Sequence, residues 1–481
     1  MFLHERLRAR AAAGRPVRVG LIGAGKFGSM FLSQAPTTEG LEVRVIADLD
    51  PDRARAACRA VGWSDAQIAA TRFTDDAREA VGAGGPGAGT VAGAAAGAPS
   101  GGRVGAGTGA PGGAPGGNPE IDVVVEATGD PAAGIAHARL AFAAGTSIVM
   151  VNVEADVLAG PLLAAEAREA GVVYTLAYGD QPALTCELVE WARACGFDVV
   201  AAGKGTKYLP SYHASTPDTV WEHYGLTADE AAAAGMNSRM FNSFLDGTKS
   251  AIEMAAIANA TGLTPPPDGL RFPPCGRDDL AHVLRPVEAG GQLHHKGQVE
   301  VVSSLERDGR PVPGDLRWGV YVVVEAPNDY SAACFRQYGM NTDASGRYSA
   351  MYKPFHLIGL ELNVSILAAA LLGAPTGAAQ GFVGDVAATA KRDLAAGETL
   401  DGEGGYTVYG KLLPAAASLA RGALPIGLAH GAPLTRAVRA HEVVGWDDVE
   451  LDPALPAVGA RRAMEARFSR GGTLATAGTP R

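Results

Sequence analysis

The chain has 481 residues, of which 47% are hydrophobic and 19% are charged, and its formal net charge at pH 7 is −10. One hydrophobic core rarely serves a chain of this length, so we expect two or three domains. The acidic balance argues against a nucleic-acid partner, because binding to phosphates needs clustered Lys and Arg.

The five cysteines are widely spaced and include no C-x-x-C pair, which indicates neither a disulfide framework nor a zinc site. The sequence shows no apolar core of a signal peptide and no run of about 18 apolar residues. We therefore expect a cytoplasmic protein with no membrane partner.

The first 178 residues predict a dinucleotide-binding domain of Rossmann type. Residues 1–16 are expected to form an Arg-rich helix, and strands then alternate with helices over residues 17–178. This alternation is typical of a parallel sheet, so the predicted fold class is α/β. Residues 82–118 interrupt the pattern with a Gly-rich segment, which we expect to be a disordered surface insertion because it has few large apolar side chains to bury.

The rest of the chain predicts an α+β domain and then a small β-rich one. Residues 179–355 form the second domain, with a predicted helix at 182–195, a strand at 199–203, a polar loop at 206–219, a continuous helix at 241–261, and antiparallel strands at 298–305 and 318–325. Residues 356–384 begin with an apolar helix, 356–372, that returns to the nucleotide domain. Residues 385–455 are rich in predicted strands, and residues 456–481 form a tail that we expect to be frayed beyond Gly459.

A glycine-rich loop follows the first strand and opens the first helix of the sheet. Its sequence is Gly23-Ala24-Gly25-Lys26-Phe27-Gly28. Gly23 permits the tight turn, Gly25 lets a pyrophosphate approach the backbone, and Gly28 lets the helix and the strand pack closely. The helix N-terminus supplies unpaired N–H groups and a positive dipole end. This context predicts binding of NAD or NADP.

The choice between the two nucleotides depends on the end of the next strand. Asp48 lies 20 residues beyond Gly28 and would accept hydrogen bonds from the adenosine ribose, which favours NAD. Arg53 and Arg55 follow it and could instead bind a 2′-phosphate. The sequence leaves both nucleotides open.

Several further motifs resemble one enzyme superfamily. They are the phosphate loop together with Val123-Val124-Val125-Glu126-Ala127-Thr128-Gly129, Val149-Met150-Val151-Asn152, Gly179-Asp180-Gln181-Pro182, Gly203-Lys204-Gly205-Thr206-Lys207-Tyr208, Ser215-Thr216-Pro217-Asp218 and Tyr352-Lys353-Pro354-Phe355-His356. In this order they resemble the homoserine dehydrogenase superfamily. Within it the chain is more similar to the deoxyxylulose-phosphate-reductoisomerase-like oxidoreductases, whose core is followed by a small SAF domain, which Ala390–Leu394 and Gly397–Leu400 resemble.

The resemblance implies hydride transfer at a carbonyl or alcohol carbon, and a homodimer formed through a catalytic second domain. It also places the ends of two sheet strands at the cofactor, so Ala127, Thr128, Gly129, Asn152 and Glu154 are predicted to contact the nucleotide. Homoserine dehydrogenases continue the second of these strands into a T-A-N-K sequence, whereas here Glu154 follows Asn152 and Val153. This departure argues against homoserine as the substrate.

The catalytic candidates lie in the second domain. On the predicted helix 241–261, the residues Asn242, Asp246, Lys249 and Glu253 fall on one face. Homoserine dehydrogenases carry an Asp and a Lys on the equivalent helix, which Asp246 and Lys249 match approximately. The alternative is a solvated stripe of charges. A lysine suits the chemistry because negative charge develops on the substrate oxygen during hydride transfer.

Three further residues are candidates for the same site. Lys204 and Lys207 leave a strand in a glycine-containing loop and could hold a substrate phosphate, or could simply be surface lysines. Asp180 follows a strand whose end should approach the nicotinamide, although it also suits a helix N-cap. His213 and His356 lie in family-like segments, and His294-His295-Lys296 lacks a third ligand, so no metal site is predicted. A divalent ion at Asp180 or Asp246 stays open for a reductoisomerase.

The sequence therefore predicts an NAD(P)-dependent dehydrogenase or reductase that acts on a small polar hydroxy or keto compound, either free or phosphorylated. One alternative is a reductoisomerase acting on a sugar phosphate. Another is a regulatory protein that binds NAD(P) without turnover. The SAF-like domain is expected to serve as a lid or an assembly element.

Overall fold

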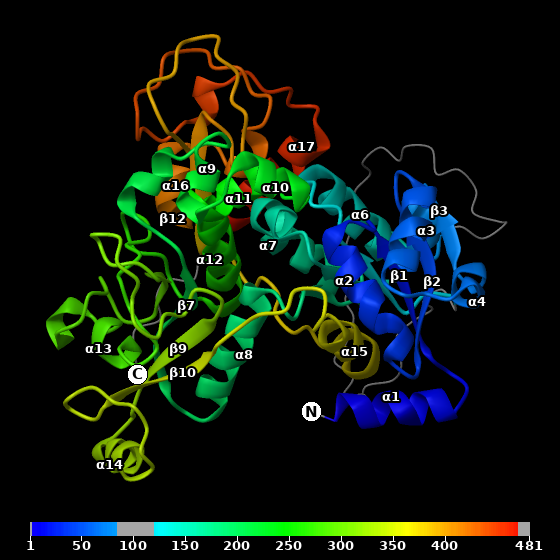
Figure 1. Cartoon of the computed structure of the whole chain (residues 1–481), viewed down its shortest axis with the longest axis horizontal. Coiled ribbons are helices and arrows are strands. Elements are labelled where there is room, and N and C mark those ends of the chain that lie inside the picture. The colour runs from blue at the N-terminus through cyan, green and yellow to red at the C-terminus, as the bar shows by residue number, and fades with distance from the viewer. Residues whose placement is uncertain (1, 84–119, 470–481) are drawn as a thin grey trace, which may run out of the picture.

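The computed structural model describes residues 2–83 and 120–469, and it divides into three parts (Figure 1). The nucleotide domain holds a six-stranded sheet, the second domain holds a four-stranded sheet, and a C-terminal unit holds a two-stranded sheet. The predicted Gly-rich insertion, 82–118, lies outside the described residues except for its first two positions. Among the described residues, no helix is long and apolar enough to cross a bilayer.

All strands of the nucleotide domain are parallel, which confirms the α/β class, and their order is β3-β2-β1-β4-β5-β6. They are β1 (Val17–Ile22), β2 (Leu41–Ala47), β3 (Arg72–Thr74), β4 (Val123–Glu126), β5 (Ser147–Met150) and β6 (Tyr174–Leu176). The chain reverses its direction of travel across the sheet between β1 and β4. Open parallel sheets bind ligands at the carboxyl ends of the strands at such a point.

Helices cover both faces of this sheet, so its central strands are buried. They are α2 (Lys26–Gln34), α3 (Pro51–Ala60), α4 (Asp65–Ala70), α5 (Ala77–Ala80), α6 (Pro131–Ala143) and α7 (Val153–Glu169), with α1 (Leu3–Ala12) at the N-terminus. Carboxylate or amide side chains cap four of them: Asp50 caps α3, Asp76 caps α5, Asp130 caps α6 and Asn152 caps α7. From the returning segment, α15 (Asn363–Leu372) packs into the same core through Ile366 and Leu367.

The second domain is built around β7 (Asp198–Thr206), in the strand order β10-β9-β7-β8. β8 (Gln298–Ser303) pairs parallel with β7, and β9 (Val320–Glu325) pairs antiparallel with both β7 and β10 (Tyr348–Lys353). β8 and β9, which we expected to form an antiparallel pair, therefore lie on opposite sides of β7. The remaining helices are α8 (Gln181–Ala194), α9 (Val220–Tyr224), α10 (Ala228–Ala233), α11 (Ser238–Leu245), α12 (Thr248–Thr261), α13 (Leu280–Val283) and α14 (Asp329–Gln337).

The prediction of one continuous helix over 241–261 is wrong, because the structure has two helices there, α11 and α12. Gly247 stands at the break with φ of 90°, a left-handed conformation that favours glycine. Asp246 ends α11, and its carboxylate accepts a hydrogen bond from the backbone N–H of Thr248 at 2.8 Å. The predicted stripe is thereby split, with Asp246 on one side of the break and Lys249 on the other.

The C-terminal unit packs on α12 and α7 and does not stand apart from the other domains (Figure 1). It pairs β11 (Gly384–Ala390) with β12 (Val408–Pro414) and continues into α16 (Ala415–Arg421). The tail expected to fray beyond Gly459 instead forms the helix α17 (Pro456–Ser469). Residues 470–481 of the predicted tail lie outside the described residues.

A buried ion pair explains why this tail is ordered. The guanidinium of Arg461 donates two hydrogen bonds to Asp385, at 2.9 and 2.6 Å, and both side chains are 1% exposed. Asp385 also accepts a hydrogen bond from the hydroxyl of Ser418 at 2.5 Å. A charge buried to this extent needs its partner, so α17 is held against the start of β11.

Replacing Arg461 by Met should therefore destabilise the protein, because the Asp385 carboxylate would stay buried without its counter-ion. The expected cost is about 3 to 5 kcal/mol, measured as a fall in the melting temperature. Arg467→Met on the same helix is the control. Arg467 pairs with Glu169 at the surface, their side chains being 42% and 64% exposed, and its loss should cost less than about 1 kcal/mol. Equal melting temperatures for the two variants would contradict this account of α17.

Candidate functional site

A cleft of about 610 Å³ lies at the carboxyl ends of the parallel strands. The nucleotide domain supplies one wall through the glycine-rich loop and the residues that follow β4 and β5. The second domain supplies the opposite wall through α11, α12 and the segment before α8, and the C-terminal unit adds one residue, Glu403. The cleft is thus formed by all three parts of the chain.

The three glycines of the loop have different roles in the structure. A Cβ on Gly23 would lie 2.8 Å from the carbonyl oxygen of Ala127, and one on Gly28 would lie 2.4 Å from the carbonyl oxygen of Gly23. A Cβ on Gly25 would meet nothing within 4 Å, and the φ of Gly25 is −70°. Packing therefore requires Gly23 and Gly28, whereas Gly25 keeps open the space in front of the α2 N-terminus.

The start of α2 is suited to a phosphate group. Its N-cap is Gly25, and no side chain caps its first N–H groups. Unpaired N–H groups and the positive end of the helix dipole attract anions. Lys26 and Phe27, which follow, line the same cleft. The loop is therefore suited to the pyrophosphate of a dinucleotide, and its binding of one stays a prediction.

Asp48 is held within the nucleotide domain by three donors. Its carboxylate accepts from the backbone N–H of Ala24 at 2.8 Å and of Asp50 at 3.0 Å, and from the guanidinium of Arg53 at 2.7 Å. Burial by itself would raise the pKa of Asp48, but these hydrogen bonds and the charge of Arg53 outweigh it, and the pKa is lowered. Asp48 is therefore ionised at neutral pH, and the Arg53 side chain, 62% exposed, covers it.

The ends of β4 and β5 place five predicted cofactor residues at the cleft. Ala127, Thr128 and Gly129 follow β4, while Asn152 and Glu154 begin α7, and all five line the cavity. Asn152 is fixed because its side chain donates to the carbonyl of Asp130 at 2.7 Å and accepts from the N–H of Ala155 at 3.1 Å.

Lys249 lies at the centre of the opposite wall. Its Nζ atom is 2.5 Å from Oε1 of Glu154. Burial would lower the pKa of Lys249, but the carboxylates of Glu154, Glu253, Asp180 and Glu403 outweigh burial, and the pKa is raised. Lys249 therefore keeps its proton at neutral pH, and it can place a positive charge beside an oxygen that becomes negative.

Asp180 combines the two roles that its sequence position suggested. It is the N-cap of α8, accepts a hydrogen bond from the N–H of Gln181 at 2.8 Å, and lines the cleft while only 6% exposed. Burial and the charge of Glu253 raise its pKa to about 6, against the opposing effect of Lys249 and His356. His356 itself lines the cleft, and its Nδ1 donates to the carbonyl of Trp318 at 2.8 Å.

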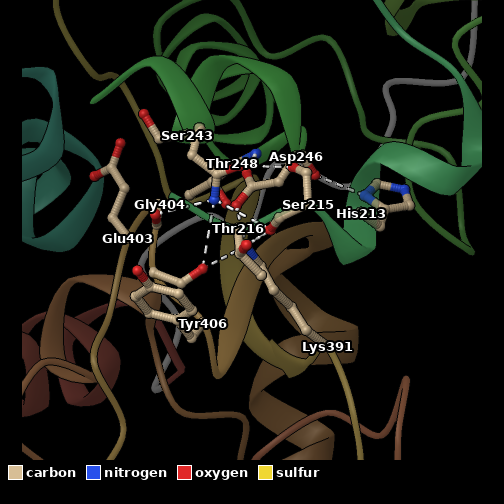
Figure 2. Close-up of polar contacts among 12 residues, drawn as sticks. His213, Ser215, Thr216, Ser243, Asp246, Thr248, Lys391, Glu403, Gly404 and Tyr406 are labelled. Atoms are coloured by element: carbon tan, nitrogen blue, oxygen red, sulfur yellow. Dashed lines mark hydrogen bonds and ion pairs between the residues drawn. The ribbon is translucent and has the colours of Figure 1, made fainter. Parts of the chain in front are cut away.

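Three predicted catalytic residues do not line this cleft. Lys204 is buried in an ion pair with Glu253, and its Nζ donates to the side chain of Gln181 at 3.0 Å. Lys207 donates to the carbonyl of His223 and lies over the ring of Tyr224. Asp246 is fully buried and forms an ion pair with Lys391 at 2.8 Å, outside the cleft (Figure 2). The two loop lysines are therefore not placed to hold a substrate phosphate there.

The sequence interpretation missed Glu403 and Arg239, which both line the cleft. Arg239 belongs to α11, and its guanidinium donates to the backbone carbonyls of Asp401 and Glu403. The run Gly402-Glu403-Gly404-Gly405 offers one acidic side chain among glycines, but nothing in the sequence connects it with Arg239, about 160 residues earlier. Among the described residues, no group of three or more His, Cys, Asp or Glu side chains is arranged to hold a metal ion.

Residues 179–362 match a family model described as "Oxidoreductase DRL, catalytic domain". This match covers less than half of the chain, spans the second domain, and supports an oxidoreductase. It agrees with the resemblance at that level, whereas the SAF assignment of residues 385–455 stays a prediction. A search of curated proteins finds no match to the chain.

Similar solved structures include a homoserine dehydrogenase from Thiobacillus denitrificans, which is 19% identical with a TM-score of 0.33, over 51% of this chain and 49% of that one. A myo-inositol dehydrogenase from Lactobacillus casei, solved with NAD(H) and myo-inositol, is 15% identical with a TM-score of 0.27, over 43% of this chain and 50% of that one. The chain spans about half the length of these structures. Similarities at these TM-scores do not bear on the activity.

The geometry of the glycine loop gives a direct test of nucleotide binding. Gly25→Val should leave the melting temperature within a few degrees, because its side chain enters open space at an ordinary φ, and should abolish binding of NAD and NADP in calorimetry by filling that space. Gly28→Ala is the comparison, and it should lower the melting temperature because its Cβ would lie 2.4 Å from the Gly23 carbonyl oxygen. Full nucleotide affinity in a folded Gly25→Val protein would show that nucleotides do not bind at this loop.

Proposed function

We propose that the protein is an NAD-dependent oxidoreductase that transfers a hydride between the nicotinamide and a small hydroxy or keto compound. The observation that carries this proposal is the pairing of two features in one cleft. Backbone N–H groups suited to a pyrophosphate lie at the α2 N-terminus, and Lys249, which keeps its proton at neutral pH, lies on the facing wall. A bound nicotinamide would supply or accept the hydride.

The residues of the chain then handle the charge on the substrate oxygen. The Nζ of Lys249 would stabilise that oxygen as negative charge develops on it, and a preorganised positive charge is effective in a cleft sheltered from water. Glu154 holds Nζ in place through the contact at 2.5 Å. Asp180, with its pKa raised to about 6, lies on the same wall and can change its protonation near neutral pH.

The polar groups of the cleft favour a hydroxyl-rich substrate over a phosphorylated one. Four acidic side chains surround Lys249, namely Glu154, Asp180, Glu253 and Glu403. Lys204 and Lys207, the candidates for a phosphate, are occupied elsewhere. No free lysine of the candidate pair is therefore placed to hold a phosphate in the cleft, so a sugar-phosphate reductoisomerase is less well supported than a dehydrogenase. The cytoplasmic location and the homodimer stay predictions.

The ionised carboxylate of Asp48 supports NAD over NADP. A 2′-phosphate would lie beside this buried negative charge, and like charges at short range repel. We expect NAD to bind at least about tenfold more tightly than NADP, which corresponds to about 1.4 kcal/mol. Arg53→Ala should change NAD affinity by less than about threefold, because Asp48 keeps its two backbone donors. If calorimetry shows that NADP binds more tightly than NAD, and that Arg53→Ala loses this preference, the assignment of NAD is wrong.

Turnover is tested by following the absorbance of the reduced nicotinamide with a panel of polyols, 2-hydroxy acids and their keto counterparts. For any compound that reacts, Lys249→Met should lower kcat by about 10² to 10³ while NAD binding is retained, since one charge donor to the oxygen is lost. Lys296→Met, at a surface lysine paired with Asp198 and Glu325, should leave kcat unchanged. Nucleotide binding without turnover of any compound would favour the regulatory alternative.

A further inference from the structure

The C-terminal unit reaches the cleft through a tight loop of glycines around Glu403. Gly402 and Gly404 have φ of 76° and 64°, which favours glycine at both positions. A Cβ on Gly404 would lie 2.1 Å from the carbonyl oxygen of Arg239 in α11. The loop thus packs directly on α11, and Glu403 supplies the one side chain of the run 402–405 that lines the cleft.

Buried hydrogen bonds fix this loop to the second domain (Figure 2). The Nζ of Lys391 donates to the carbonyls of Gly405 and Ser215, each at 2.7 Å, and pairs with Asp246 at 2.8 Å. The side-chain amide of Asn242 donates to the carbonyls of Ser215 and Gly404 at 3.1 and 3.0 Å. The position of Glu403 is therefore set by contacts to α11, to its C-cap residue Asp246 and to Ser215.

Charged and polar groups face Glu403 from every element packed against it. They are Glu154 of α7, Lys249 of α12, Asp246 at the α11–α12 junction, and Ser243 and Arg239 of α11. Burial and the repulsion of Glu154 raise the pKa of Glu403 to about 8, while Lys249 opposes the shift. Near neutral pH both the acid and the carboxylate of Glu403 are populated, whereas Lys249 stays protonated.

Glu403 also has a route for exchanging its proton with solvent. A second cavity of about 490 Å³ lies between the nucleotide domain and the C-terminal unit, and it shares Gly129, Glu154, Arg239 and Glu403 with the cleft. Asp180, the other carboxyl group with a raised pKa beside Lys249, is 6% exposed, and its carboxylate accepts a hydrogen bond from the backbone N–H of Gln181. Glu403 is therefore better placed than Asp180 to take up a proton again after each reaction cycle.

We propose that Glu403, carried into the cleft by the C-terminal unit, exchanges the proton of the substrate oxygen during hydride transfer, beside the fixed positive charge of Lys249. This inference rests on the proposed function. In the direction of reduction the carbonyl carbon gains the hydride, the C=O π pair moves to oxygen, and that oxygen takes the proton of the Glu403 carboxyl group. The products are the alcohol, the oxidised nicotinamide and the Glu403 carboxylate. Oxidation reverses each transfer.

Proton release on nucleotide binding tests this inference without a known substrate. Calorimetry is run with NAD⁺ and with NADH near pH 8 in buffers of different ionisation enthalpy. The cationic ring of NAD⁺ should favour the carboxylate form of Glu403 and release about half a proton, while NADH should release much less. Glu403→Gln should lose the release, and Glu398→Gln, at a surface pair with Arg392 in the same unit, should keep it.

The outcomes separate the two proposals. No binding of either nucleotide to the unmodified protein would overturn the proposed function. Binding with a proton release that is unchanged in Glu403→Gln would overturn the role of Glu403 alone. If Glu403→Gln does not fold, the unmodified protein alone still tests the proposal. The number of protons released on NAD⁺ binding should then be largest near pH 8, and a number that is the same from pH 6 to pH 10 would contradict the proposal.

The same carboxyl group should leave a signature in stability. Its folded pKa, about 8, lies above the usual 4.5, so its contribution to stability is present below about pH 4.5 and is lost as the pH rises through 8. The melting temperature of Glu403→Gln, relative to that of the unmodified protein, should therefore rise by several degrees between pH 5 and pH 9. A difference that stays constant with pH would contradict a Glu403 that titrates near pH 8 in the folded protein.

Discussion

The ion pair between Lys249 and Glu154 is the interaction on which the arrangement of the cleft depends. It joins α12 of the second domain to α7 of the nucleotide domain across a partly buried space. Burial alone would favour the neutral amine, and only the surrounding carboxylates keep the lysine charged. Glu154, at the start of α7, thus holds a lysine that comes from α12.

One buried ion pair fastens the C-terminal unit to the rest of the chain, and a second holds the unit itself together. Lys391 and Asp246 hold it to the α11–α12 junction, and Arg461 and Asp385 hold α17 to the start of β11. Pairs of this kind recover little net free energy after desolvation, but a misplaced unit would leave charges buried without partners. The pair of Lys391 and Asp246 therefore favours one docking position, and that position is the one that brings Glu403 into the cleft. The C-terminal unit thus contributes one side chain to the cleft, and the lid or assembly role expected from the sequence stays a prediction.

Local features of the sequence were sufficient to predict the nucleotide domain. Strand, glycine loop and helix follow one another closely, and each glycine role can be argued from neighbours a few residues away. The break at Gly247 was not predicted because a single glycine inside an amphipathic pattern is compatible with a continuous helix. Lys204 leaves the expected strand, but its partner Glu253 is about 50 residues away, so the sequence could not show that its charge is already neutralised. Glu403 was missed for the same reason, since its neighbours Glu154 and Lys249 come from two other domains.

A crystal structure of the protein with bound NADH tests the central claim most directly. The account predicts the pyrophosphate at the backbone N–H groups that open α2, and the nicotinamide ring between Thr128 and Lys249, with Asp180 and Glu403 at the same end of the cleft. A nucleotide bound elsewhere, or one whose nicotinamide lies away from Lys249, would contradict the claim that these residues form one active site.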